Sequence, residues 1–235
     1  MASSVAASPI EIHCQGVLFD MDGILISSLG SVERSWAKWG HMRGVDAALA
    51  IKTAHGCRAI ETVAKLRPDL DSEAELKVIE EIEIEDNEGL TVLPGVLTLL
   101  HALTQAGSDR PRWTVVTSAT ERLARARMAV GGIPTPERIV TADRVTRGKP
   151  HPEPYFDGAA LLGFKPEECV VFEDSTSGTQ AGRAAGCTVV ATTFSHPIET
   201  LSAAHYLVDD LTGVTAERDP ASNALILRLT PRSDR

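Results

Sequence analysis

Short apolar runs recur along the chain, each bounded by glycine or polar residues. They stand at residues 16–19, 113–116, 138–140, 169–172, 188–191 and 206–208. Because these runs are apolar at successive rather than alternate positions, they are typical of strands covered on both faces, as in a parallel sheet. The pattern therefore predicts a buried parallel sheet at the centre of the protein.

Helical patterns separate most of these runs. They stand at residues 96–103, 121–130, 155–162 and 177–185. Thr120 is placed to cap the second of these helices, and Gly163 and Gly186 follow the last two, where glycine commonly ends a helix. Strands that alternate with helices predict a doubly wound, Rossmann-like α/β core with right-handed crossovers.

One long region, residues 29–92, breaks this alternation, because it has helical spacing but no convincing strand. We expect it to form an inserted α-helical cap. Trp36 and Trp39 have helix spacing and are expected to pack inside the cap. Residues 72–88 are strongly acidic, a pattern that usually marks a solvated helix face.

These patterns predict four parts along the chain. The parts are an α/β core at 12–28 and 93–215, the cap at 29–92, an N-terminal segment at 1–11, and a C-terminal edge strand with a tail at 216–235. The apolar residues 224–229 supply that last strand, and the tail after it is expected to be loose.

Composition and charge narrow the class of protein. The 235 residues are 43% hydrophobic, enough for a globular core, and the net charge of −9 argues against nucleic acid or an anionic membrane as main partner. No apolar run is long enough to span a bilayer, and the N-terminus lacks the basic start and apolar stretch of a secretory signal. We expect a cytoplasmic monomer or weak dimer whose scattered cysteines are reduced and buried.

Acidic and hydroxyl residues follow three of the predicted strands directly. These residues are Asp20 and Asp22, then Thr117 and Ser118, then Glu173 and Asp174. The carboxyl ends of parallel strands open onto one crevice, so these side chains are expected to converge there. Carboxylates that converge repel one another unless a cation lies among them, and a set of oxygen ligands favours Mg²⁺ when a phosphate completes its shell.

Lys149 adds the positive group that phosphate chemistry needs. Its ammonium can neutralise a carboxylate and a bound phosphoryl group, while Ser118 and the backbone N–H groups near Ala119 suit phosphate oxygens. A free carboxylate such as Asp20 can act as nucleophile and give an aspartyl-phosphate. A second carboxyl two residues on, Asp22, can protonate the leaving oxygen and then deprotonate water.

Four short motifs in this chain resemble those of the haloacid dehalogenase superfamily. They are Phe-Asp-Met-Asp-Gly at 19–23, Val-Thr-Ser at 116–118, Gly-Lys-Pro at 148–150 and Val-Phe-Glu-Asp-Ser at 171–175. They occur in order, with a helical insert between the first and the second, and the resemblance covers about residues 12 to 215. Ile24 replaces the threonine usual after the first motif, which removes one hydroxyl near the site.

The resemblance implies a role for each matching residue. Asp20 would be the nucleophile and a metal ligand, and Asp22 the acid/base with its main-chain carbonyl on Mg²⁺. Ser118, or less favourably Thr117, would bind the transferring phosphate beside Lys149. Asp174 would ligate the metal, and Glu173 would hold a metal-bound water. The sequence thus predicts a Mg²⁺-dependent phosphatase.

The cap carries the prediction about substrate. His55 and Arg58 lie in a loop that resembles the substrate-contacting cap loop of sugar-phosphate and polyol-phosphate phosphatases, and residues 148–155 resemble glycerol-phosphate and deoxysugar-phosphate phosphatases. A small phosphorylated metabolite is therefore the expected partner. Phosphoglycolate and a hexose-phosphate mutase reaction remain alternatives, although Val32 stands near the position of the histidine in mutases that resemble this chain. Asp22 disfavours a dehalogenase or phosphonate hydrolase, and the intact motifs disfavour a non-catalytic module.

Overall fold

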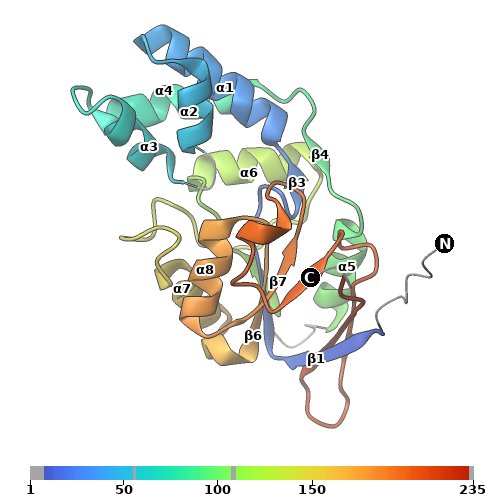
Figure 1. Ribbon diagram of the computed structural model, residues 1–235. Coiled ribbons are helices and arrows are strands. Elements are labelled where there is room, and N and C mark those ends of the chain that lie inside the picture. The colour runs from blue at the N-terminus through green and yellow to red at the C-terminus, as the bar shows by residue number, and fades with distance from the viewer. Residues whose placement is uncertain (1–7, 55–56, 107–109, 233–235) are drawn as a thin grey trace, which may run out of the picture.

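The computed structural model describes residues 8–54, 57–106 and 110–232. At its centre lies a five-stranded parallel sheet with the strand order β5-β2-β6-β7-β8 (Figure 1). Its strands are Trp113–Val115 (β5), Gly16–Phe19 (β2), Cys169–Glu173 (β6), Thr188–Thr192 (β7) and Tyr206–Val208 (β8). The parallel sheet and its intervening helices confirm the predicted α/β class.

Helices and a second sheet cover the two faces of the parallel sheet. Helices α7 (Glu153–Leu162) and α8 (Thr176–Ala185) pack on one face, and α5 (Val96–Ala106) packs on the other together with a small antiparallel sheet. Successive strand residues divide between two apolar clusters, since Leu18 lies among α7 and α8 side chains while Phe19 lies among those of α5. Both faces of the sheet are therefore excluded from solvent, which explains why the strands are apolar at successive positions.

The helix ends follow the sequence closely. Helix α6 (Glu121–Val130) starts after Thr120, whose hydroxyl accepts a hydrogen bond from the backbone N–H of Leu123 at 3.3 Å. Gly163 and Gly186 end α7 and α8 in the left-handed region, with φ of 77° and 90°. These capping predictions are confirmed. Two short 3-10 helices span Pro166–Glu168 and Ile198–Thr200. Across the described ranges, no helix is long and apolar enough to cross a membrane.

The strand predicted at 138–140 does not form. Val140 makes a single bridge with Val116, and no ladder extends from it. Ile139 and Val140 are nevertheless 1% and 4% exposed. The apolar character of this run therefore reflects burial beside the sheet edge rather than strand pairing.

The predicted C-terminal edge strand belongs to a different sheet. Strand β10 (Leu225–Leu229) lies between β1 (Ile10–Cys14) and β9 (Thr215–Arg218) in the three-stranded antiparallel sheet, so it is central there. Leu225, Leu227 and Leu229 are buried and alternate with less buried residues, the pattern of a strand with only one covered face. The antiparallel sheet closes the face that α5 leaves open.

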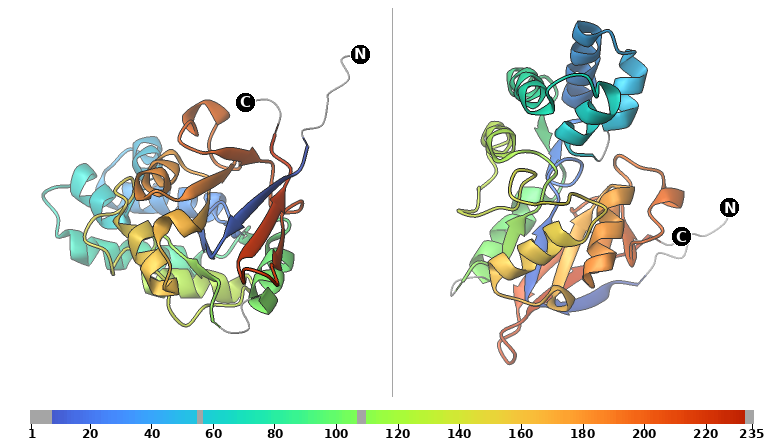
Figure 2. Two further views of the ribbon diagram at one scale, coloured as in Figure 1. Left: turned by 90° about the horizontal axis from the view of Figure 1, so that it is seen from below. Right: turned by 90° about the vertical axis from the view of Figure 1, so that its left-hand side faces the viewer.

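In the described residues, the cap consists of four helices and rises above the carboxyl end of the parallel sheet (Figure 2, right). They are α1 (Leu29–Arg43), α2 (Ala47–Ala54), α3 (Ala59–Leu66) and α4 (Ser72–Glu85). The chain leaves the core and returns to it through a two-stranded antiparallel ribbon of β3 (Ile26–Ser27) and β4 (Thr91–Val92). The cap has its own apolar core, in which Trp36 and Trp39 are 2% and 0% exposed with ring centroids 5.4 Å apart, as expected.

Candidate active site

The sheet register brings three chain segments to one point. Phe19 of β2 pairs with Val115 on one side and with Phe172 on the other. The residues that follow these three, Asp20, Val116 and Glu173, therefore emerge together at the carboxyl edge of the sheet. This is the crevice that the sequence predicted.

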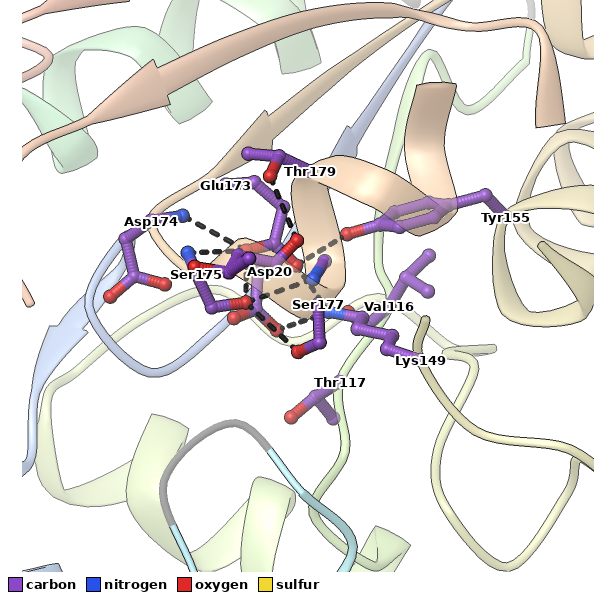
Figure 3. A network of polar contacts seen from close by, with 12 residues as sticks. Asp20, Val116, Thr117, Lys149, Tyr155, Glu173, Asp174, Ser175, Ser177 and Thr179 are labelled. Carbon is purple, nitrogen blue, oxygen red and sulfur yellow. Dashed lines mark hydrogen bonds and ion pairs between the residues drawn. The ribbon is translucent and has the colours of Figure 1, made fainter. Parts of the chain in front are cut away.

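Lys149 joins these three segments from the loop that precedes α7. Its ammonium donates to Asp20 Oδ1 at 2.8 Å, to Glu173 Oε1 at 2.7 Å and to the carbonyl of Val116 at 3.0 Å (Figure 3). The lysine side chain is only 3% exposed. Burial opposes its charge, but Asp20 and Glu173 more than offset that penalty and hold the pKa of Lys149 above its ordinary value. The ammonium is therefore a fixed positive charge at the base of the site.

Glu173 is a fully buried carboxylate held by protein groups. Besides Lys149, its oxygens accept hydrogen bonds from the hydroxyl of Tyr155 at 2.8 Å, the N–H of Asp174 at 2.9 Å, and the N–H and hydroxyl of Ser175, both at 3.0 Å. A Cβ at Gly178 would lie 1.6 Å from Glu173 Oε1, so only glycine leaves room for the carboxylate. Burial opposes its ionisation, but Lys149 and these donors hold the pKa of Glu173 below its usual range.

The three buried carboxylates of Asp20, Glu173 and Asp174 offer oxygen atoms that all lie within 4.8 Å of one another. Burial raises the pKa of Asp20 to about 7, although Lys149 lowers it, and burial with the charges of Glu173 and Asp20 raises the pKa of Asp174 well above its usual value. One ammonium does not balance three carboxylates. The excess of buried negative charge and the all-oxygen donor set fit a hard divalent cation.

Gly23 lets Asp174 reach this cluster. Its φ is +85°, in the region that favours glycine, and an added Cβ would lie only 1.7 Å from Asp174 Oδ2. The glycine of the first motif is therefore needed for space as well as for backbone conformation.

Asp22 is not among the three converging carboxylates. Its Oδ1 accepts a hydrogen bond from the hydroxyl of Ser28 at 2.6 Å, and Arg127 Nη1 donates to both of its oxygens at 2.9 and 3.0 Å. Arg127 comes from α6 and is 3% exposed. The carboxyl group of Asp22 is thus held in the same cavity as Asp20 by residues from the cap linker and from the core.

The acidic helix α4 is the expected solvated face only in part, because Glu73, Glu81 and Glu85 are exposed whereas Glu75, Glu80 and Glu83 are buried. Glu80 accepts hydrogen bonds from the hydroxyl of Thr120 and from Arg122 Nη1, the latter at 2.9 Å, and the side chain of Glu83 is 7% exposed with its oxygen 3.5 Å from Arg127 Nη2. Burial raises the pKa of Glu83 to about 7 even though Arg127 lowers it. The prediction was wrong for Glu80 and Glu83, because hydroxyl and guanidinium groups near the start and on the buried face of α6 compensate their charge.

One cavity of about 540 Å³ lies between the cap and the core and contains most of the predicted residues. Asp20, Asp22, Lys149 and Asp174 line it, as do Thr117, Ser118, Ala119 and Arg58. Thr117 is 4% exposed and accepts a hydrogen bond from the N–H of Ala119 at 3.1 Å, whereas Ser118 is half-buried. His55 lies outside the described residues.

Arg58 links the cap to the loop that carries Lys149. Its Nη1 donates to the carbonyl of Val145 at 3.3 Å, and a Cβ at Gly148 would lie 2.8 Å from its Nε. We expected all four cysteines to be buried. Cys57, adjacent to Arg58 in the cap, is instead exposed and lines the cavity. Cys14, Cys169 and Cys187 are buried, as expected. Cys57 and Arg58 therefore both face the cavity rather than the cap core.

The family is shown by a match between residues 17–192 and the family model of haloacid dehalogenase-like hydrolases. The chain belongs to this family. Hexitol phosphatase A of Escherichia coli is 39% identical to this hydrolase over 218 residues, which cover 92% of this chain and all of that protein. Glycerol-1-phosphate phosphohydrolase 2 of Saccharomyces cerevisiae is 35% identical over 201 residues, which cover 81% of this chain and 80% of that protein.

Solved structures share the fold of this hydrolase. The crystal structure of CbbY from Rhodobacter sphaeroides in complex with phosphate superimposes with a TM-score of 0.74, covering 85% of this chain and 95% of that chain at 22% identity. At that identity the likeness establishes the arrangement of core and cap and no more.

Several residues of the site were given no role by the sequence of this hydrolase. Tyr155 and Ser175 hold Glu173, and Ser28 and Arg127 hold Asp22. Arg127 could have been found, because it stands four residues after Leu123 and therefore on the buried face of an amphipathic helix, where a charged residue requires a partner.

Proposed function

We propose that this hydrolase removes phosphate from small sugar or polyol phosphate monoesters through a phospho-Asp20 intermediate. The observation that carries the proposal is the contact of Asp20 with Lys149 at 2.8 Å on the floor of a cavity that the cap encloses. The phosphatase names of relatives that align with most of the chain support the same reaction and substrate class.

In the first step, an oxygen of Asp20 forms a bond to phosphorus while the bond from phosphorus to the ester oxygen breaks. Asp22 gives its proton to that ester oxygen, which leaves as an alcohol. In the second step, Asp22 takes a proton from water as the water oxygen forms a bond to phosphorus and the bond from phosphorus to the Asp20 oxygen breaks. Inorganic phosphate departs, and both carboxyl groups return to their starting states.

The phosphoryl oxygens have donors ready in the cavity. Lys149 supplies a fixed positive charge, and Ser118 supplies the expected hydroxyl donor near the start of α6. The N–H of Ala119, also expected to bind phosphate, is already bonded to Thr117 and would exchange that partner for a phosphoryl oxygen. Thr117 is buried beside them and shapes this turn through its bond from Ala119. Because these groups are already fixed by the fold, little reorganisation accompanies the charge shift of the transfer.

Asp20, Asp174 and the main-chain carbonyl of Asp22 would hold Mg²⁺, with Glu173 beside them. When bound, Mg²⁺ supplies positive charge that offsets the carboxylates and the phosphoryl oxygens. Glu173 accepts hydrogen bonds from Lys149, Tyr155 and Ser175, so its main contribution is to orient Lys149.

The mutase alternative is disfavoured by the cavity wall. Val32, near the position of the mutase histidine, lines the cavity with an apolar side chain that cannot relay a proton. The reaction expected is therefore hydrolysis, with release of inorganic phosphate rather than an isomeric phosphate ester.

The test is phosphate release from a panel of sugar and polyol phosphates with Mg²⁺, with and without EDTA. We expect steady release that EDTA abolishes, and a loss of at least about a thousandfold in kcat for Asp20→Asn, because the amide is not a nucleophile. Asp157→Asn, on the exposed face of α7, is the matched control and should retain activity. Near-normal turnover by Asp20→Asn would refute the proposed nucleophile, and an isomeric ester seen by ³¹P NMR would indicate a mutase.

A further inference from the structure

Glu173 and Asp174 are adjacent in the chain but differ in how their carboxylates are held. The carboxylate of Glu173 accepts hydrogen bonds from three side chains and from two backbone N–H groups. Among the described residues, Ser195 is the only side chain that donates to the carboxylate of Asp174. The orientation of this candidate metal ligand therefore depends on Ser195.

Ser195 reaches Asp174 because two neighbouring strands end side by side. Glu173 of β6 pairs with Ala191 of β7, and the two strands run in the same direction. Strand β7 ends at Thr192, so the segment after it emerges at the carboxyl edge of the sheet, where Asp174 follows β6. The topology of the sheet thus brings the Ser195 hydroxyl to the site.

The contact between the two residues is made by the serine hydroxyl. Ser195 Oγ donates to Asp174 Oδ2, and it also lies 3.3 Å from the main-chain carbonyl oxygen of Asp174. An ionised carboxylate is the stronger acceptor of the two, so it takes the single hydroxyl proton. Ser195 therefore forms a charge-assisted hydrogen bond with one oxygen of the candidate ligand.

His196 fixes the direction of this hydroxyl. Its ring nitrogen Nδ1 lies 2.7 Å from Ser195 Oγ. Because a hydroxyl has only one proton, and Ser195 gives that proton to Asp174, its oxygen must accept from the ring. The proton of the imidazole is therefore on Nδ1, and the hydrogen bonds run in one direction from His196 through Ser195 to Asp174.

Gly23 confines the same oxygen of Asp174. A Cβ at Gly23 would lie 1.7 Å from Asp174 Oδ2, so the backbone of the first motif packs closely against the carboxylate. Asp174 is 3% exposed, and both it and Ser195 line the cavity. Packing limits where the carboxylate lies, and the bond from Ser195 supplies the directional contact that selects its orientation.

Resting on the proposed function, we propose that Ser195, oriented by His196, is the positioning residue of Asp174 and thereby raises the affinity of the site for Mg²⁺. The carboxylates of Asp20 and Asp174 repel each other when no cation lies between them. The hydrogen bond from Ser195 opposes rotation of Asp174 away from Asp20, so less ordering accompanies metal binding. Removal of such a contact to a metal ligand commonly weakens metal affinity by about ten- to a hundredfold.

Isothermal titration of the whole chain with Mg²⁺, in the absence of substrate, tests this role. Ser195→Ala should raise the Kd for Mg²⁺ by about tenfold or more. The Mg²⁺ concentration that half-activates hydrolysis of p-nitrophenyl phosphate should rise by a similar factor, and excess Mg²⁺ should restore most of the lost rate. Thr200→Ala is the matched control, because it removes a hydroxyl of the same segment that bonds the carbonyl of Pro197 at 2.8 Å, and it should leave the Kd unchanged.

The outcomes separate this inference from the proposed function. An unchanged Kd for Mg²⁺ in Ser195→Ala with a lower Tm of the metal-free protein would make Ser195 a structural residue and overturn the inference. An unchanged Kd with a raised KM would make Ser195 a substrate contact and would also overturn it. Wild-type protein that binds Mg²⁺ but releases no phosphate from any ester would refute the proposed function, while the two Kd values would still decide the role of Ser195. Wild-type protein that binds no Mg²⁺ would refute both the metal site and this inference.

Discussion

Replacement of Tyr155 by phenylalanine tests the polar network beneath the active site. Tyr155 is fully buried, and its hydroxyl donates to Glu173 Oε1 at 2.8 Å. Burial and the nearby charges of Glu173 and Asp20 raise the pKa of Tyr155 well above its usual value, so the phenol remains a donor at every practical pH. The substitution deletes one hydrogen bond to a buried carboxylate and leaves the ring in place.

The expected loss can be estimated from this contact. A hydrogen bond to a charged group contributes about 1.5–3 kcal/mol, and because Lys149 still binds the same oxygen at 2.7 Å, we expect about 2 kcal/mol. For a chain of this size that loss lowers Tm by about 4–8 °C. Tyr155 does not line the cavity, so kcat/KM for p-nitrophenyl phosphate should change by less than about tenfold.

Urea unfolding and thermal melts with Mg²⁺ present measure the stability, and phosphate release measures the activity. Tyr206→Phe, at a half-buried position of β8, is the matched control and should shift Tm by less than about 2 °C. An unchanged Tm for Tyr155→Phe would show that the hydrogen bond contributes nothing. Intact stability with a loss of activity above about a hundredfold would show instead that the phenol acts in the reaction.

Three further predictions follow from the site. The pKa of Glu83 is about 7 in the folded protein and 4.5 in the unfolded chain. Ionisation of Glu83 therefore destabilises the fold increasingly as the pH rises from 4.5 to 7, fully above pH 7 and not at all below pH 4.5. As the pH is raised from 4.5 to 8, the free energy of unfolding of Glu83→Gln should therefore increase by up to about 3 kcal/mol relative to that of the wild type. A difference in urea unfolding that does not change with pH would contradict this. Arg58→Ala should raise KM for the true substrate but not for p-nitrophenyl phosphate, whereas Arg147→Ala, with a side chain 67% exposed, should change neither. Equal effects of Arg58→Ala on both substrates would remove it from specificity. Gly23→Ala should displace Asp174 and weaken Mg²⁺ activation by about tenfold or more, while Gly89→Ala, with φ of +74° and open space around it, should retain activity. Normal Mg²⁺ dependence in Gly23→Ala would contradict the packing argument.

The sequence was sufficient for the core of the fold and for the residues at the strand ends. Each strand of the parallel sheet is buried on both faces, so its apolar run is visible without knowledge of its neighbours. The convergence of Asp20 and Asp174 then follows from strand direction, whereas Lys149 reaches them from the loop before α7. The run at 138–140 shows the limit of this argument, because a buried segment with only one bridged residue has the same apolar pattern as a strand.

The sequence-based prediction failed where charged residues of the cap are compensated by residues of the core. Glu80 and Glu83 have the composition of a solvated helix, and only their contacts with α6 show that they are buried. Cys57 shows the converse, since a cysteine expected to be buried stands exposed on a loop at the cavity.

The sequence by itself determined the α/β core, the inserted helical cap and the carboxylates at the strand ends, because these depend on local periodicity and chain direction. Only the tertiary structure decided which groups hold those residues: Tyr155 donates a hydrogen bond to Glu173, and Arg127 donates to Asp22. It also decided that Glu80 and Glu83 of α4 line the cavity. The reason is physical. A charged side chain is buried only when partners from distant parts of the chain compensate it, and spacing along one segment does not contain that information.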